Sequence, residues 1–446
     1  MCKKLIIPKQ VVTVDQNNNI FSNECVEITD GIITNIREYT QSEISDFSGD
    51  VINAESCTLI PGFVQTHVHL CQTLFRGLAD NLELLDWLKL RIFPYENAHN
   101  KESLRSSTKL GINELLLGGT TTILDMGTLR HQEVVFEELI NSGLRAIAGK
   151  CMIDINDLYP SFKASTEIEL KETYELAKAF HNKNNGKIKY GFAPRFVLSC
   201  SEKLLIEAGQ MMNDFEGSLY HTHSSENKKE IEEVRKRFNK ENIDYFNSIG
   251  VLSNRTVLAH GIHVNEKEVN ILKNKNVNIA HCPSSNLKLG SGIANIPRFI
   301  KEGISVSLGA DGAPCNNELN IFTEMRLAAL IQKPIHGPTE MDAKTVFRLA
   351  TINGANALGL GSEIGSIEVG KKADLVLMNL ETPLLSLSND EENIYSKIVY
   401  SAGRNNIDSV MIEGEWLVRD GKSLLYEKTE LRRNGENELN QLLKRV

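Results

Sequence analysis

Between residues 61 and 365 the sequence alternates short apolar segments with segments of helix length, and no other feature restricts the fold as strongly. The apolar segment GTTTILDMG, for example, is followed by the amphipathic segment HQEVVFEELINSG and then by LRAIAGKCMID. Strands and helices that alternate at this pitch form a parallel sheet, and enough of these units close it into a barrel. We therefore predict an α/β fold in which residues 61–365 form a (β/α)8 TIM-like barrel.

The segments on either side of the barrel have a different pattern, one of short strands and turns. Residues 1–60 contain LIIPKQVVTV and CVEITDGIITNIRE, and Thr29-Asp30-Gly31 is typical of a hairpin turn. Residues 366–446 contain KKADLVLMNLE and SVMIEGEWLVRDGK before a final amphipathic helix. We expect the two terminal segments to fold together as a flanking β-sandwich domain.

Composition excludes several classes of partner. The net charge is −9 and the basic residues are interleaved with glutamates, so nucleic acid is not an expected partner. No apolar run is long enough to cross a membrane. The eight cysteines contain no C-x-x-C pair, which favours reduced thiols and a cytoplasmic location.

Five strand-like segments end in titratable side chains. Their ends carry His67 and His69, then His221 and His223 followed by Glu226, then His260, then His281, and finally Asp311. In a barrel of this kind the active site is built at the carboxyl ends of the strands. A single H-x-H pair also suits a half-buried polar strand, but five such ends in barrel order predict one shared site.

Imidazole nitrogens combined with a carboxylate suit Zn²⁺ or Fe²⁺, and coordination positions left to water are typical of a catalytic metal. The order P-G-F-x-x-x-H-x-H, H-x-x-E, A-H-G and G-A-D-G resembles the amidohydrolase superfamily over essentially the whole chain. The resemblance implies a metal held by His67, His69, His223 and Asp311, with Glu226 and His260 as the proton carriers.

The resemblance also implies a single metal ion. Two-metal members of the superfamily have a carboxylated lysine at the end of the fourth strand, where this chain has Pro194 and Arg195. We expect His221 to point away from His223 and to be structural. For His281, a supporting or substrate-contacting role and a packing role both stay open.

The chemistry expected of such a site is hydrolysis at an aminated ring carbon. A divalent metal lowers the pKa of a bound water towards neutrality. Glu226 would take the proton of the attacking water and deliver it to the adjacent ring nitrogen, while Asp311 holds the water in line. His260 would stabilise the developing negative charge, and ammonia would leave.

Longer stretches indicate the substrate. HLCQTLFRGLADNLELLDWLKLRIFPYE, AHCPSSNLKLGSGIA and GADGAPCNNELN resemble deaminases of adenosine derivatives, which act on 5′-deoxyadenosine, 5′-methylthioadenosine and S-adenosylhomocysteine. By this resemblance Glu96 would accept hydrogen bonds from ribose hydroxyls and Trp87 would contact the purine or ribose. The alternatives are a core aromatic for Trp87 and an exposed carboxylate at a helix start for Glu96.

Arg195 departs from that pattern, because the adenosine-type relatives usually have histidine there. Together with Gln72 it resembles guanine deaminases, and a guanidinium fork suits a ring carbonyl or nitrogen acceptor. Guanine therefore stays open as a substrate, followed by triazine or pterin rings. A small nucleobase deaminase is excluded because P-C-x-x-C is missing, and retention of every ligand argues against a metal-free scaffold. Barrels of this kind resemble homo-oligomers.

Overall fold

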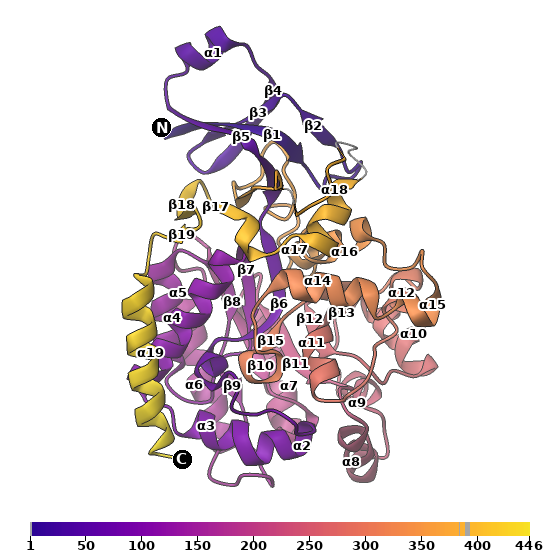
Figure 1. Cartoon of the computed structure of the whole chain (residues 1–446). Helices are drawn as coiled ribbons and strands as arrows, with labels where there is room; N and C mark the ends of the chain where they lie inside the picture. Colours follow the sequence, from indigo (N-terminus) through magenta and orange to yellow (C-terminus); the bar gives the residue numbers. More distant parts are fainter. Residues whose placement is uncertain (1, 383, 389–392) are drawn as a thin grey trace.

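The computed structural model describes residues 2–382, 384–388 and 393–446. Figure 1 shows a barrel surrounded by helices, with a separate sheet at one end that contains strands from the beginning and the end of the chain. Within the described ranges, no helix combines the length and the apolar composition needed to cross a membrane.

The barrel is built from parallel strands, which neighbour each other in chain order. They are β6 (Phe63–His69), β7 (Thr120–Asp125), β8 (Arg145–Ala148), β10 (Ile188–Pro194), β11 (Leu219–Ser224), β12 (Thr256–His260), β13 (Asn278–His281), β14 (Ser305–Leu308) and β15 (Asp311–Gly312), with the short β9 (Cys151–Met152) beside β10. β14 pairs with β13, and β15, which directly continues it, pairs with β6. This last pairing closes the sheet, so the predicted barrel fold is confirmed.

Helices between the strands cover the outside of the barrel. They are α4 (Lys101–Leu117), α5 (Gln132–Ser142), α6 (Thr166–Phe180), α7 (Glu202–Met211), α8 (Lys228–Phe238), α9 (Asn242–Ser248), α10 (Glu266–Lys275), α11 (Pro283–Lys288), α12 (Ile296–Lys301), α13 (Ala313–Asn316), α14 (Ile321–Leu330), α15 (Lys333–His336), α16 (Ala343–Leu349) and α17 (Ile352–Ala357). Capping side chains set several helix starts; Asn227, for example, accepts from the backbone of Lys229 at the start of α8. In the longer helices an apolar face packs inward, as in α4, where Leu104, Ile112 and Leu115 are buried.

The chain between β6 and α4 does not run directly to the outer layer. It forms η1 (Leu70–Phe75), α2 (Leu84–Trp87), η2 (Leu88–Ile92) and α3 (Phe93–Asn97). Leu84, Trp87 and Leu88 are buried and also line the cavity described below. This long excursion therefore supplies an apolar wall at the carboxyl ends of the strands.

The flanking domain is one continuous mixed sheet. Its strands are β1 (Lys3–Val12), β2 (Ile20–Ser22), β3 (Glu24–Thr29), β4 (Ile32–Glu38), β5 (Asp50–Pro61), β16 (Leu375–Met378), β17 (Ile407–Ile412), β18 (Glu415–Arg419) and β19 (Lys422–Ser423), with α1 (Gln41–Asp46) beside them. β5 runs parallel to β1 on one side and antiparallel to β16 on the other, so it joins the two terminal segments. The predicted hairpin turn is also confirmed: Asp30 and Gly31 have φ values of 48° and 82° between β3 and β4.

Two buried contacts attach the flanking sheet to the barrel. Arg145, at the start of β8, donates to Asp374 with an Nε–Oδ2 distance of 2.8 Å, and both side chains are almost fully buried. The backbone N–H of Gly62 donates to the carbonyl of Asp374 at 2.9 Å. The sheet therefore sits at the end of the barrel where the strands begin, away from the strand ends that carry the site.

The final amphipathic helix of the sequence, α19 (Lys428–Leu443), packs on the barrel rather than on the flanking sheet. Figure 1 shows it alongside α4 and α5, and a side chain at Gly435 would collide with Leu110 of α4. After the helix, Arg445 donates to the carbonyl oxygen of Ala98 at 2.8 Å. This helix therefore covers the part of the barrel that follows α3.

A metal-ligand cluster at the strand ends

Four side chains from three parts of the barrel converge at its carboxyl end. They are His67 and His69 at the end of β6, His223 on β11, and Asp311 in β15, and one ligand atom from each lies within 4.8 Å of the others. The Nε2 atoms of His67 and His69 each lie 3.3 Å from Asp311 Oδ1, and the Nε2 atoms of His69 and His223 also lie 3.3 Å apart. The chain thus has a His/His/His/Asp cluster at the place where the sequence predicts a metal.

The donor set fits a divalent cation. His223 Nδ1 lies 2.7 Å from the carbonyl oxygen of Arg195, and because a carbonyl only accepts, Nδ1 carries the proton and Nε2 presents a lone pair. His67 Nε2 is buried, and Asp311 Oδ1 lies 3.3 Å from it. Lone pairs that face one another in a buried site are compensated by a bound metal, and a backbone acceptor that fixes the tautomer is typical of metal-binding histidines.

His221 corrects one expectation. The prediction that it points away from His223 is wrong, because side chains two residues apart on a strand project from the same face. His221 faces the barrel interior, and its Nε2 lies 2.9 Å from His67 Nδ1. It therefore contacts a residue of the cluster, a contact that orients the His67 ring and is consistent with the structural role expected of it.

Burial sets the protonation states of the cluster. Desolvation holds the pKa of His69 and of His223 well below the usual histidine value, so both rings are neutral at pH 7. Burial alone would raise the pKa of Asp311, but the neighbouring histidines, His67 first among them, outweigh it and hold that pKa well below the usual range. Neutral imidazoles and an ionised carboxylate are the forms that bind metal.

Glu226 and His260 lie together next to the cluster. Glu226 Oε2 is 3.4 Å from His260 Nε2, and both residues are buried. Burial, followed by the charges of Asp311 and Glu230, raises the pKa of Glu226 well above the usual glutamate value. A buried carboxyl group with a raised pKa can take up and release a proton near neutrality.

The backbone is strained at the same strand ends. His260 has a φ of 74° and Asp311 a φ of 60°, in the left-handed region that residues with a side chain seldom adopt. Ser225, next to Glu226, has a φ of 55°. Such strain is concentrated at functional sites, where the surrounding structure holds a side chain in one direction.

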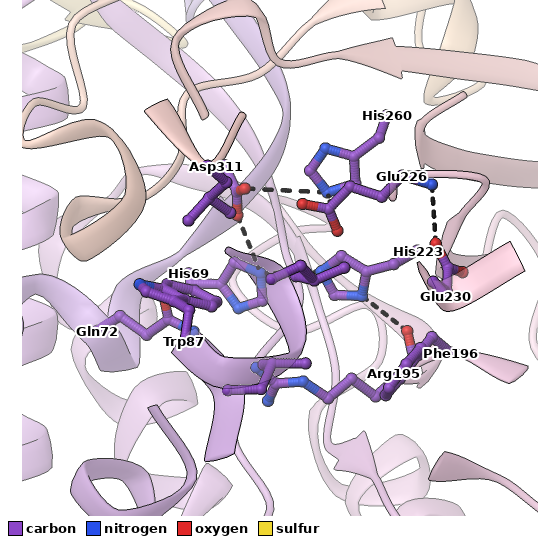
Figure 2. A pocket seen from close by; sticks show the side chains of 13 residues that line it. His69, Gln72, Trp87, Arg195, Phe196, His223, Glu226, Glu230, His260 and Asp311 are labelled. Carbon is purple, nitrogen blue, oxygen red and sulfur yellow. Dashed lines mark hydrogen bonds and ion pairs between the residues drawn. The ribbon is translucent and has the colours of Figure 1, made fainter. Parts of the chain in front are cut away.

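A cavity with about 400 Å³ of empty space opens in front of these groups. Figure 2 shows its polar side chains pointing inward from several strand ends, with Trp87 across from His223 and His260. The lining residues are His69, Gln72, Leu84, Trp87, Leu88, Arg195, Phe196, His223, Glu226, Glu230, His260, Leu289 and Asp311. Its wall combines apolar groups with a few polar ones, as in small-molecule sites.

The predicted substrate contacts fall into two groups. Gln72, Trp87 and Arg195 line the cavity, whereas Glu96 lies behind them and is 2% exposed. Arg195 Nη1 donates to Glu96 Oε2 at 2.9 Å, and Gln72 Nε2 donates to Glu96 Oε1 at 2.7 Å. Glu96 therefore orients two residues of the wall, and its contact with ribose stays a prediction.

His281 ends β13 but is not among the described residues that line the cavity. It is fully buried, neither ring nitrogen has a hydrogen-bond partner among the described residues, and burial lowers its pKa to about 3. Its predicted role as a substrate contact stays a prediction.

Sequence reasoning missed several residues of the wall. Leu84 and Leu88 were detectable in principle, because they repeat at helical spacing around Trp87. Glu230 was detectable as the N3 residue of the capping box whose N-cap is Asn227. No local signal marks Phe196 or Leu289 as parts of the cavity, because they reach it only through the fold.

The fold and the cluster together define the class of protein. Residues 58–417 match the amidohydrolase family, and the chain belongs to that family. Among curated relatives it is 36% identical over 423 residues to a 5′-deoxyadenosine deaminase of Methanocaldococcus jannaschii, covering 92% of this chain and 97% of the relative. It is 35% identical over 437 residues to a 5-methylthioadenosine/S-adenosylhomocysteine deaminase of Thermodesulfovibrio yellowstonii, covering 97% of each. A solved structure of an adenosine deaminase from Xanthomonas campestris with bound zinc superposes with a TM-score of 0.91 at 27% identity, covering 99% of each chain.

Proposed function

We propose that this protein is a metal-dependent aminohydrolase that converts 5′-deoxyadenosine, 5′-methylthioadenosine or S-adenosylhomocysteine into the corresponding inosine derivative and ammonia. The observation that carries the proposal is the position of the Glu226–His260 pair, 3.4 Å apart, on the same cavity wall as the His/His/His/Asp cluster. The two curated relatives named above act, by their names, on these nucleosides.

The proposed reaction assigns each group a separate task. A divalent metal on His67, His69, His223 and Asp311 would supply Lewis acidity and a water of lowered pKa. Glu226 accepts the proton of the attacking water and transfers it to the ring nitrogen beside the reacting carbon, for which its raised pKa is suited. His260 Nε2, which has no hydrogen-bond partner among the described residues, faces the same space, and once it carries a proton the ring stabilises the negative charge that develops there.

The remaining wall would recognise the nucleoside. Trp87 Nε1 is a buried donor without a hydrogen-bond partner among the described residues, so we propose that it donates to the substrate. Arg195 and Gln72 are held by Glu96 and present their remaining polar atoms to the cavity. Because Leu84, Leu88 and Leu289 complete the wall, the purine would lie against apolar side chains.

Guanine is the second candidate, and one observation favours it. Arg195 occupies both carboxylate oxygens of Glu96, at 2.9 Å and 3.4 Å, and Gln72 shares one of them. A carboxylate engaged in this way is a weaker acceptor for ribose hydroxyls, while the arginine keeps donors for a ring carbonyl.

A substrate panel separates the two candidates. The zinc-loaded protein is assayed for ammonia release and for the ultraviolet change of the base with 5′-deoxyadenosine, 5′-methylthioadenosine, S-adenosylhomocysteine, adenosine, guanine and a triazine. The highest kcat/KM is expected for one of the first three. A preference for guanine would refute the proposed substrate, and a lack of ammonia release from every compound would refute the proposed reaction.

Four finer proposals follow from the same family relation. We propose zinc as the metal, with iron as the alternative, since imidazole and carboxylate bind both. We propose a cytoplasmic location, supported by eight cysteines that form no disulfide, and a homo-oligomeric state. We also propose the division into residues 1–60, 61–365 and 366–446. Metal analysis, cell fractionation, light scattering and limited proteolysis test these four proposals in turn.

A further inference from the structure

In the short helix α11, three consecutive polar residues follow Pro283 and contact three different carboxylate or imidazole groups. Ser284 donates through its hydroxyl and its backbone N–H to the buried carboxylate of Glu324, which belongs to α14. Ser285 contacts Asp311, and Asn286 contacts His260. One helical turn is therefore connected to two residues of the proposed reaction.

The contact of Ser285 defines the direction of the Asp311 carboxylate. The hydroxyl lies 2.6 Å from Asp311 Oδ2 and donates to it, because an ionised carboxylate only accepts. The other oxygen, Oδ1, accepts from the backbone N–H of Gly312 at 2.8 Å and faces His67 and His69. Ser285 thus holds one oxygen so that the other stays with the histidine cluster.

The contact of Asn286 defines the tautomer of His260. Asn286 Oδ1 lies 2.8 Å from His260 Nδ1, and an amide oxygen only accepts, so Nδ1 carries a proton. His260 Nε2 then faces Glu226 Oε2 at 3.4 Å and Asp311 Oδ2 at 3.9 Å. Asn286 is 1% exposed, so this contact is shielded from bulk solvent.

We propose that Ser285 and Asn286 are positioning residues: Ser285 fixes the rotation of Asp311 for metal binding, and Asn286 accepts a hydrogen bond from His260 Nδ1–H, which leaves Nε2 facing the reaction and free to take a proton. Neither residue lines the cavity among the described residues, so both act through the groups that they contact. A metal ligand or a catalytic histidine in such sites generally needs a hydrogen-bond partner behind it, because that partner fixes its orientation. The role of Asn286 rests on the proposed function, whereas the role of Ser285 rests on the cluster alone.

The test compares N286A, N286D and S285A with the S284A control, all purified with zinc. S284A alters the same helical turn and breaks only the contact with Glu324. Steady-state kinetics on the preferred substrate of the panel give kcat and KM, and zinc retention during exposure to a chelator is measured without substrate. Nitrogen NMR of the histidine rings reports the tautomer of His260.

For Asn286, kcat of N286A is expected to fall about 10- to 100-fold with an unchanged KM. N286D keeps an oxygen acceptor at the same place and should recover most of the lost kcat. If N286D is as impaired as N286A, or if the ring spectrum of N286A shows an unchanged tautomer, the proposal for Asn286 is overturned.

For Ser285, S285A is expected to bind zinc about 10- to 100-fold more weakly, while S284A retains zinc like the wild type. Equal retention by S285A and wild type, or equal loss by S284A, overturns the proposal for Ser285. A wild-type protein that is inactive on the whole panel refutes the proposed function instead. In that case zinc retention still tests the role of Ser285, and the His260 ring spectrum still tests the role of Asn286.

Discussion

Replacing Glu226 by glutamine removes a charge from the active-site wall and leaves the size of the side chain unchanged. The wild-type carboxylate is 4% exposed, and its Oε2 atom lies 3.4 Å from His260 Nε2. An amide at this position can still contact substrate, but it can no longer accept a proton from water. Because Glu226 is not one of the four residues of the cluster, zinc binding should be retained.

The expected loss of activity follows from the role of the carboxylate. Proton transfer by a positioned side chain contributes about 10²- to 10⁴-fold to a rate, so kcat of E226Q should fall by that factor. This loss corresponds to about 2.7–5.4 kcal/mol of transition-state stabilisation, at about 1.36 kcal/mol for each tenfold change. The KM should change much less, since the volume and the apolar contacts of the wall are the same.

Folding stability should change in the opposite direction. Burial and neighbouring negative charges raise the pKa of Glu226 above the ordinary 4.5, so its ionisation costs folding free energy as the pH rises above that value. Without metal, E226Q should therefore equal the wild type below about pH 4.5 and exceed it in free energy of unfolding at neutral pH.

The assay combines ammonia release, metal analysis and denaturant unfolding of the metal-free proteins. E232Q, which changes an exposed glutamate on the same helix α8, is the matched control and should behave like the wild type. Undiminished kcat in a zinc-replete E226Q would show that Glu226 carries no proton in the reaction. Loss of zinc from E226Q would instead show that it belongs to the metal-binding set.

Three further outcomes are expected. D311A should lose zinc and activity together, as measured by metal analysis after dialysis; full zinc occupancy would contradict the assigned ligand set. D374N removes the charge that faces buried Arg145 and should lower the free energy of unfolding by about 3–5 kcal/mol in denaturant titration, with the active site intact; an unchanged midpoint would show that the pair is dispensable. E96Q weakens the ion pair that holds Arg195 and should raise KM for the preferred nucleoside more than it lowers kcat; equal kinetics would remove Glu96 from substrate recognition.

The sequence predicts the barrel and one shared site at its strand ends because both depend on local pattern, whereas the choice of the four ligands rests on the resemblance to the amidohydrolases. Strand-like segments that end in His67, His69, His223 and Asp311 carry information about their partners, since parallel strands in a barrel bring their carboxyl ends together. The metal-ligand cluster assembles as expected, and the alternation of strands and helices predicts the closed sheet.

Other features depend on packing between distant segments and leave little trace in local pattern. The engagement of Glu96 by Arg195 joins residues that are 99 positions apart, and the apolar wall from Leu84 and Leu88 exists only because α2 folds over the strand ends. The final helix was recognisable as amphipathic, but its periodicity does not reveal that it packs on α4. His221 faces the barrel interior together with His223, because side chains alternate faces along a strand and residues two positions apart share one.

The central place of β5 in the flanking sheet has a consequence for how the chain is made. One edge of β5 pairs with β1, which precedes it in the chain, but its other edge pairs with β16, which lies more than three hundred residues later. Until residues 375–378 leave the ribosome, β5 keeps a row of open backbone groups, which is a template for association with other chains. Nascent or truncated chains that end before β16 should therefore aggregate more readily than the finished protein.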